Sequence, residues 1–239
     1  MKNYLFCQID ILGFSDLICN PPRELSINNI EKSYNLIFQK NLKDCKDFHQ
    51  ELPGFLLFSD TAFIYKEDFC NCYNFILYLS NVLQNSFYSI KNEQENLIPQ
   101  LYFKFPLRGA FSIGSLVINN NNIIGKPIVS TYQWERLQNW IGISIPYNDI
   151  SKVMNDLPEC EIKKIMADNL LIEYDVPTKN GIFKTYAINF ISKDNKNKII
   201  SIIEQELLNY KDQLNIYTKY YSTKKFVEYI ISNSLYVSN

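Results

Sequence analysis

The chain has 239 residues, of which 46% are hydrophobic, so it can bury a sizeable core and is not globally disordered. Its 24 basic and 25 acidic residues leave a net charge of −1, without the positive excess of a nucleic-acid-binding domain. No apolar run reaches the roughly 18 residues of a membrane helix, and the N-terminus has no signal-peptide pattern. We therefore expect a cytoplasmic protein that binds neither nucleic acid nor membrane.

The cysteines and the histidine argue against a zinc site or a histidine-dependent hydrolase. Cys70 and Cys72 are the only close pair among six cysteines, and one intervening residue is the wrong spacing for zinc ligands. His49 is the single histidine and falls in a predicted polar helix, so Cys–His or Ser–His catalysis would depend on it alone. We expect buried or partly buried free thiols.

Strands and helices alternate along the first half of the chain. Apolar runs bounded by turn residues predict strands, and apolar residues at helical spacing predict helices. In chain order we expect a buried strand at 3–12 that ends at Gly13, a loop at 19–26, a helix to about residue 49, two short strands at 54–66 around Ser59-Asp60, a helix at 67–89, a strand at 101–118 and a short strand after the asparagine run 119–122.

The second half continues the same mixture of elements. In chain order we expect a helix at 127–140, a strand at 141–145, an antiparallel pair formed by "LLIEYDV" and "IFKTYAINF", and amphipathic helices at 196–211 and 214–233. We divide the chain into a core of residues 1–150 and a C-terminal extension, residues 151–239, packed on the same domain.

The order β-α-β-β-α-β predicts a ferredoxin-like α+β sheet covered by helices on one face. Its first strand and the 54–66 hairpin are neighbours, so Asp10 and Asp60 are expected side by side at one end of the sheet. Carboxylates in an apolar setting are costly and repel each other, and a hard divalent cation, Mg²⁺ or Mn²⁺, relieves both costs. The backbone amides of Gly13, Phe14 and Ser15 follow Asp10 near a helix start and form a candidate phosphate cradle.

Four ordered motifs resemble the catalytic domain of class III nucleotide cyclases. They are "IDILGFSDL", "LLFSDTAFIY", "RGAFSIGSLV" and "IIGKPIVSTYQWERLQ", and the resemblance covers about residues 3–145. It implies a homodimer with sites at the subunit interface, in which a ribose 3′-hydroxyl attacks the α-phosphate of a bound nucleoside triphosphate. It also implies that two ions, Mn²⁺ or Mg²⁺, are held by Asp10, Asp60 and the carbonyl of Ile11, and that the Gly13–Ser15 amides meet the β- and γ-phosphates.

The sequence departs from adenylate and guanylate cyclases where those enzymes select the base and stabilise the transition state. Leu56 and Asn122 stand at the two base-selecting positions, and Val129 and Gln133 stand where the helix would carry Asn and Arg. Either the domain is a catalytically inactive nucleotide-binding relative, or it has altered base recognition. An adenylate or guanylate cyclase with atypical base contacts is a further alternative.

We favour altered base recognition because both metal carboxylates remain. The compact chain resembles the single-domain pyrimidine cyclases of Pycsar antiphage systems. That resemblance implies cyclic UMP from UTP, or cyclic CMP from CTP, as a diffusible signal that activates a separate effector.

Several other residues are candidates for contacts with the substrate. Arg108 is the best remaining cation for phosphate charge, with pairing to a glutamate or exposure to solvent as the alternatives. Tyr132 is a candidate for stacking on the base, although aromatic residues on a helix more often belong to a core or a dimer interface. Arg136 is a candidate replacement for the missing helix arginine, and Glu135 is either a surface charge or the partner of an arginine.

Overall fold

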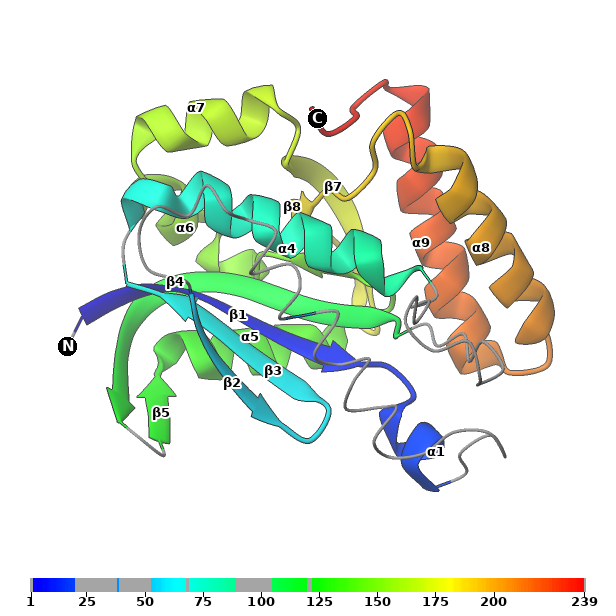
Figure 1. Cartoon of the computed structure of the whole chain (residues 1–239), viewed down its shortest axis with the longest axis horizontal. Coiled ribbons are helices and arrows are strands. Elements are labelled where there is room, and N and C mark those ends of the chain that lie inside the picture. Colours follow the sequence, from blue (N-terminus) through cyan, green and yellow to red (C-terminus); the bar gives the residue numbers. More distant parts are fainter. Residues whose placement is uncertain are drawn as a thin grey trace, which may run out of the picture.

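The structure is a computed structural model that describes residues 2–19, 38, 53–67, 69–88, 105–119 and 122–238. The described strands form one sheet in the order β2-β3-β1-β4-β6-β8-β7, with β5 paired to β4 (Figure 1). The strands are β1 (Lys2–Ile11), β2 (Gly54–Phe58), β3 (Thr61–Lys66), β4 (Leu107–Asn119), β5 (Asn122–Gly125), β6 (Gly142–Ser144), β7 (Leu171–Thr178) and β8 (Gly181–Ile188). The α-helices are α1 (Phe14–Cys19), α4 (Cys72–Ser86), α5 (Lys126–Leu137), α6 (Ile150–Asp156), α7 (Glu159–Ala167), α8 (Lys196–Asn209) and α9 (Leu214–Ser232).

Most predicted elements are confirmed, with shifts of a few residues at their ends. The hairpin around Ser59-Asp60 is present as β2 and β3, and the last two amphipathic helices are α8 and α9. The helices α6 and α7 are absent from the prediction, because each is short and shows too few turns of apolar periodicity. The predicted helix that ends near residue 49, with His49, and the start of the 101–118 strand lie largely outside the described residues.

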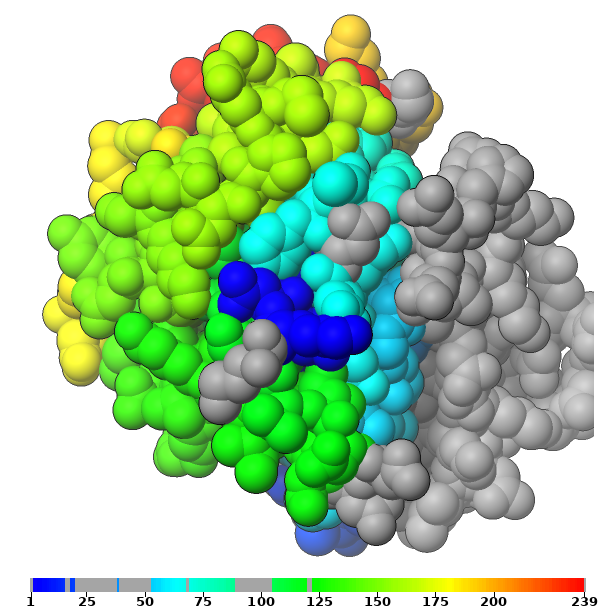
Figure 2. Space-filling view, turned by 90° about the vertical axis from the view of Figure 1, so that its left-hand side faces the viewer, coloured from blue at the N-terminus to red at the C-terminus, as the bar shows by residue number. Residues whose placement is uncertain are grey.

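β1 lies in the interior of the sheet, between β3 and β4. It pairs antiparallel with β3 on one side and with β4 on the other, and its residues from Leu5 to Ile9 are all buried. Figure 2 shows the N-terminal end of β1, in blue, between the green β4–β5 segment and the cyan segment of β3 and α4. A strand held on both edges is a rigid place from which to present a side chain such as Asp10.

Helices cover both faces of this sheet, not one face as the element order predicted. On one face, Phe75 of α4 packs against Phe111 of β4, with ring centroids 6.0 Å apart. On the other face, Thr131 of α5 donates a hydrogen bond to Gln8 of β1 at 3.4 Å. α5 lies on this second face because it is the crossover between β4 and β6, which pair in parallel, and it follows the β-α-β-β-α-β unit.

The C-terminal segment continues the same sheet and then caps one end of it. β8 joins β6 through the pair Ser144–Ala187, and α8 and α9 lie side by side at that end (Figure 1). α9 is anchored by Thr223, whose buried hydroxyl accepts a hydrogen bond from the N–H of Ile141 at 2.8 Å. The division into residues 1–150 and 151–239 stays a prediction, since one sheet runs through both.

Across the part of the chain that the structure describes, no helix combines the length and the apolar character needed to span a membrane.

Replacing Thr223 with Val should destabilise the fold by about 1–3 kcal/mol, because it leaves the buried N–H of Ile141 without its acceptor. Thr218→Val is the matched control, since the hydroxyl of Thr218 donates its hydrogen bond to the carbonyl of Leu214 within an exposed turn of the same helix. Its cost should stay within about 0.5 kcal/mol. Urea unfolding of both variants measures the difference, and equal losses would contradict the anchoring role of Thr223.

Candidate functional site

Asp10 and Asp60 lie next to each other at one end of the sheet. Asp10 is the penultimate residue of β1, and its cross-strand neighbours are Thr61 of β3 and Arg108 of β4. Asp60 lies in the β2–β3 turn, where its carbonyl accepts a hydrogen bond from the N–H of Ile11 at 3.1 Å. Asp60 is close enough to Asp10 to raise the pKa of its carboxyl group. The predicted adjacency of the two aspartates is therefore present in the structure.

The environment of Asp10 opposes its negative charge. Burial raises the pKa of Asp10 to about 7, with further increases from the charges of Glu135 and Asp60, while Arg108 acts in the opposite direction. An ordinary aspartate has a pKa near 3.9 and is fully ionised at neutral pH. The protein alone thus supplies too little positive charge for the carboxylates at this strand end.

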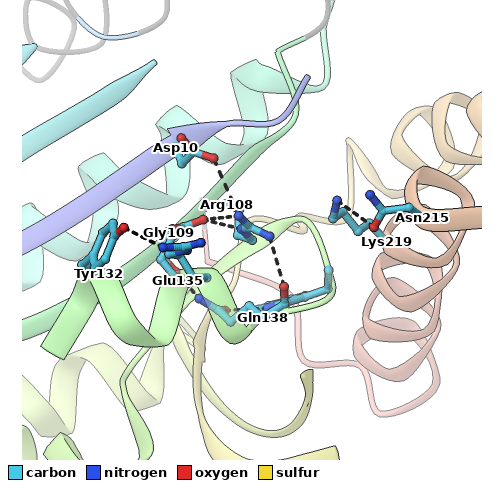
Figure 3. Close-up of polar contacts among 10 residues, drawn as sticks. Asp10, Arg108, Gly109, Tyr132, Glu135, Gln138, Asn215 and Lys219 are labelled. Atoms are coloured by element: carbon cyan, nitrogen blue, oxygen red, sulfur yellow. Dashed lines mark hydrogen bonds and ion pairs between the residues drawn. The ribbon is translucent and has the colours of Figure 1, made fainter. Parts of the chain in front are cut away.

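Arg108 is held mainly by Glu135 rather than by Asp10 (Figure 3). Its Nε donates to Oε1 of Glu135 at 2.5 Å, and a second guanidinium nitrogen contacts the same oxygen. The nearest distance from the guanidinium to Oδ2 of Asp10 is 3.7 Å. The side chains of Arg108 and Glu135 are only 10% and 4% exposed, so this is a buried ion pair between β4 and α5. Of the alternatives for Glu135, the structure shows the partner of an arginine.

Gln138 is a further partner of Arg108. The carbonyl of Gln138 accepts a hydrogen bond from the guanidinium at 3.2 Å. Its side chain donates to the carbonyl of Gly109 at 2.7 Å and accepts from Trp140 Nε1 at 2.7 Å and Ser144 at 2.8 Å. This buried network holds the backbone that binds Arg108. The sequence analysis missed Gln138, because a single glutamine after a helix has no recognisable spacing to its partners.

The turn after Asp10 has the geometry that only glycine adopts easily. Gly13 has φ of +80°, and α1 begins directly after it with Phe14 and Ser15. Phe14 is half-buried against the core, while Ser15 is exposed. The contact of these three amides with phosphates stays a prediction.

The predicted base-contacting residues are not gathered beside Asp10 within one chain. Leu56 lies in β2, half-buried and opposite Phe63 of β3. Asn122 starts β5 and pairs with Asn119 at the far end of β4, roughly 40 Å along the strand from its beginning near Arg108. A site that uses both Asp10 and Asn122 must therefore draw on two chains.

Tyr132 is on the exposed side of α5. Its hydroxyl accepts a hydrogen bond from Arg136 at 2.7 Å, and the guanidinium of Arg136 also lies over the Tyr132 ring. Both side chains are accessible to a molecule outside the chain. Stacking of Tyr132 on a base and the role of Arg136 stay predictions.

Lys219 is a cation near the site that the sequence analysis did not single out. α9 brings it toward the cluster of Asp10, Arg108 and Glu135 (Figure 3). A lysine in an amphipathic helix carries no sequence signal for such a role, because most are on solvated faces.

The comparisons with known proteins identify the fold. No protein-family model and no curated protein matches the sequence. Among solved structures, the non-canonical dimeric guanylyl cyclase domain of the RhoGC fusion protein from the aquatic fungus Blastocladiella emersonii aligns with a TM-score of 0.50 at 12% identity, over 79% of this chain and 96% of that one. The catalytic core of a rhodopsin-guanylyl cyclase with converted specificity, in complex with ATPαS, aligns with a TM-score of 0.50 at 10% identity, over 79% and 95%. The chain therefore has the α+β fold of class III cyclase catalytic domains.

In the metal-free protein, Asp10→Asn should raise the free energy of unfolding more at about pH 8 than at about pH 5. The folded-state pKa of Asp10, about 7, lies above its ordinary value, so ionising this group costs stability. That cost grows as the pH rises from about 4 to about 7 and is then constant, and asparagine lacks it. Urea unfolding in EDTA at the two pH values measures the effect. An equal gain at both would show that Asp10 is an ordinary aspartate.

Proposed function

We propose that this protein is a metal-dependent nucleotide cyclase that converts a pyrimidine nucleoside triphosphate into its 3′,5′-cyclic monophosphate and pyrophosphate. The observation that carries the proposal is the adjacency of Asp10 and Asp60 at the end of a cyclase-type sheet, with the charge of Asp10 only partly compensated by Arg108. A fold that had only to be stable would gain nothing from two like charges side by side.

The residues present fit a hard divalent cation. Among the described residues, no cluster of three or more His, Cys, Asp and Glu side chains forms a ready-made metal site. Asp10 and Asp60 with the carbonyl of Ile11 would hold Mg²⁺ or Mn²⁺ through oxygen and leave most coordination positions for substrate phosphates. Two such ions would lower the pKa of the attacking hydroxyl and neutralise charge on the leaving group.

The chain's own groups would bind and orient the triphosphate around these carboxylates. In the proposed reaction the ribose 3′-oxygen bonds to the α-phosphorus, the bond from that phosphorus to the bridging oxygen breaks, and pyrophosphate leaves while the hydroxyl proton passes to solvent. Arg108 is buried and already bound to Glu135, so its part would be to fix the position of Asp10 and to add positive potential. The Gly13–Ser15 amides would face the outer phosphates.

The choice of a pyrimidine rests on the residues at the base-selecting positions. Leu56 has no polar group with which to read a purine edge, and Val129 and Gln133 replace the usual helix pair. The resemblance to Pycsar cyclases favours UTP, with CTP as the second choice, and it alone supports a role as an antiphage signal. The solved neighbours favour a purine cyclase as the alternative, because one is named a guanylyl cyclase domain and the other binds ATPαS.

We propose that the working form is a homodimer with sites shared between the chains. Leu57 and Phe58 at the tip of the β2–β3 hairpin are 46% and 78% exposed, and Ile124 of β5 and Val129 of α5 are 64% and 55% exposed. Exposed apolar groups of this kind mark an interface. The similar guanylyl cyclase domain is itself named a non-canonical dimer. In the dimer proposed for this chain, Asn122 of one copy would approach Asp10 of the other.

Incubating the protein with each of the four nucleoside triphosphates and Mn²⁺, and identifying products by mass spectrometry, tests the activity. We expect cyclic UMP or cyclic CMP from the wild type. Asp10→Asn and Asp60→Asn should each lower turnover by at least about 100-fold while the circular dichroism spectrum is unchanged, because they keep shape and remove charge. Near-wild-type turnover in both variants would eliminate the two-carboxylate mechanism, and no product from any nucleotide would favour the inactive binding domain.

Phe58→Asp should turn the dimer into a monomer and lower turnover by at least about 10-fold, since a charge in a buried apolar contact is strongly unfavourable. Leu208→Asp is the matched control, because Leu208 is also highly exposed but lies on α8. Sedimentation velocity measures the assembly. A monomeric variant with full turnover at low concentration would contradict a shared site.

A further inference from the structure

Lys219 belongs to the C-terminal helix, but its side chain points toward the candidate site (Figure 3). Thr223, one turn further along α9, is buried and bound to the N–H of Ile141. Residues four apart lie on the same face of a helix, so Lys219 also faces the body of the domain. In Figure 3 its side chain extends from α9 toward Arg108 and the segment of Gln138. The docking of α9 thus determines where this ammonium group lies.

The groups around Lys219 compensate the positive charge of its ammonium group poorly. Burial lowers the pKa of Lys219, and the positive charges of Arg108 and Lys179 lower it further, against the opposing effect of Asp10 and Glu135. Among the described residues, the hydrogen bond that Nζ makes is to the neutral side chain of Asn215, at 3.4 Å. No carboxylate of the described chain forms an ion pair with it. A half-buried ammonium whose charge is disfavoured by other cations would be stabilised by a bound anion.

The position of Lys219 indicates which kind of anion it would bind. Arg108 is already engaged by Glu135, so it is less available to a ligand than Lys219. The side chain of Lys219 points toward Arg108 (Figure 3), whose guanidinium lies 3.7 Å from Asp10, the carboxylate proposed to hold a divalent cation. An anion that bridges such a cation and an ammonium group is a phosphate of a polyphosphate chain.

We propose that Lys219 binds a phosphate group of the triphosphate substrate at the site of its own chain. This inference rests on the proposed function and extends it, because it makes the C-terminal helix part of the substrate-binding machinery. Removing the lysine should then weaken polyphosphate binding without affecting the metal. A charge-assisted hydrogen bond of this kind corresponds to roughly 10- to 100-fold in affinity.

The experiment uses inorganic tripolyphosphate with Mg²⁺ as the probe and calorimetry as the readout, on the full chain. Lys219→Met should bind tripolyphosphate at least about 10-fold more weakly than the wild type, and Lys219→Arg should restore most of the affinity. Lys225→Met is the control on the same helix, because Lys225 is exposed and pairs with Glu228 at 3.0 Å. Its affinity for tripolyphosphate should be unchanged. Affinity for Mn²⁺ alone, measured by electron paramagnetic resonance, should be equal in all four proteins.

Unfolding measurements show whether a loss of tripolyphosphate binding comes from the missing ammonium group or from a less stable fold. Lys219→Met should be at least as stable as the wild type, because it removes a poorly compensated charge, and Lys219→Gln serves if the Met variant does not fold. Wild-type affinity in a folded Lys219 variant, or a wild type that does not bind tripolyphosphate, would overturn the inference.

Turnover separates this inference from the proposed function. An active cyclase whose KM and kcat are insensitive to Lys219→Met overturns the inference alone. A protein without cyclase activity whose tripolyphosphate binding depends on Lys219 overturns the proposed function and retains the inference.

Discussion

The register of β1 between β3 and β4 determines where the charged groups of the site lie. Asp10 is opposite Thr61 on one side and Arg108 on the other, and its side chain shares the α5 face of the sheet with Arg108. Side chains alternate along a strand, so a slip of one residue would turn Asp10 onto the apolar α4 face. The ten paired positions of β1 with β4, covered by helices on both faces, prevent such a slip.

The buried ion pair of Arg108 and Glu135 fixes the position of α5 relative to β4, and so relative to the register of β1. A buried ion pair is weak evidence for stability, since desolvating both charges offsets much of their attraction. Its clear effect is positional: Glu135 takes the larger share of the guanidinium, and Asp10 is left with a long contact of 3.7 Å. The raised pKa of Asp10 follows first from its burial and then from the charges of Glu135 and Asp60, against which the long contact with Arg108 acts. Negative charge is therefore in excess at the end of β1, and the positive charge of Lys219 lies beside this end.

The fold and the site bear on the function in different ways. The likeness to guanylyl cyclase domains, at 10–12% identity, shows how the chain is folded. The aspartate pair and its electrostatics carry the proposal of nucleotide cyclisation, because they are features of these particular side chains. The distance along β4 between Arg108 and the residue paired to Asn122 is the physical argument for a site built from two chains.

The sequence by itself determined the elements with strong periodicity and the pair of aspartates. The apolar run of β1, the hairpin around Ser59-Asp60 and the long amphipathic helix α9 all carry local patterns that survive without knowledge of the fold. Element order then made β1 and the hairpin neighbours, which brought Asp10 to Asp60. Only the tertiary structure decided the partners of Arg108 and the position of Lys219. Those contacts join residues that are far apart in the chain. They depend on which face of α5 and of α9 packs against the sheet. That orientation is determined by the packing energy of the whole core, so no local sequence pattern predicts it.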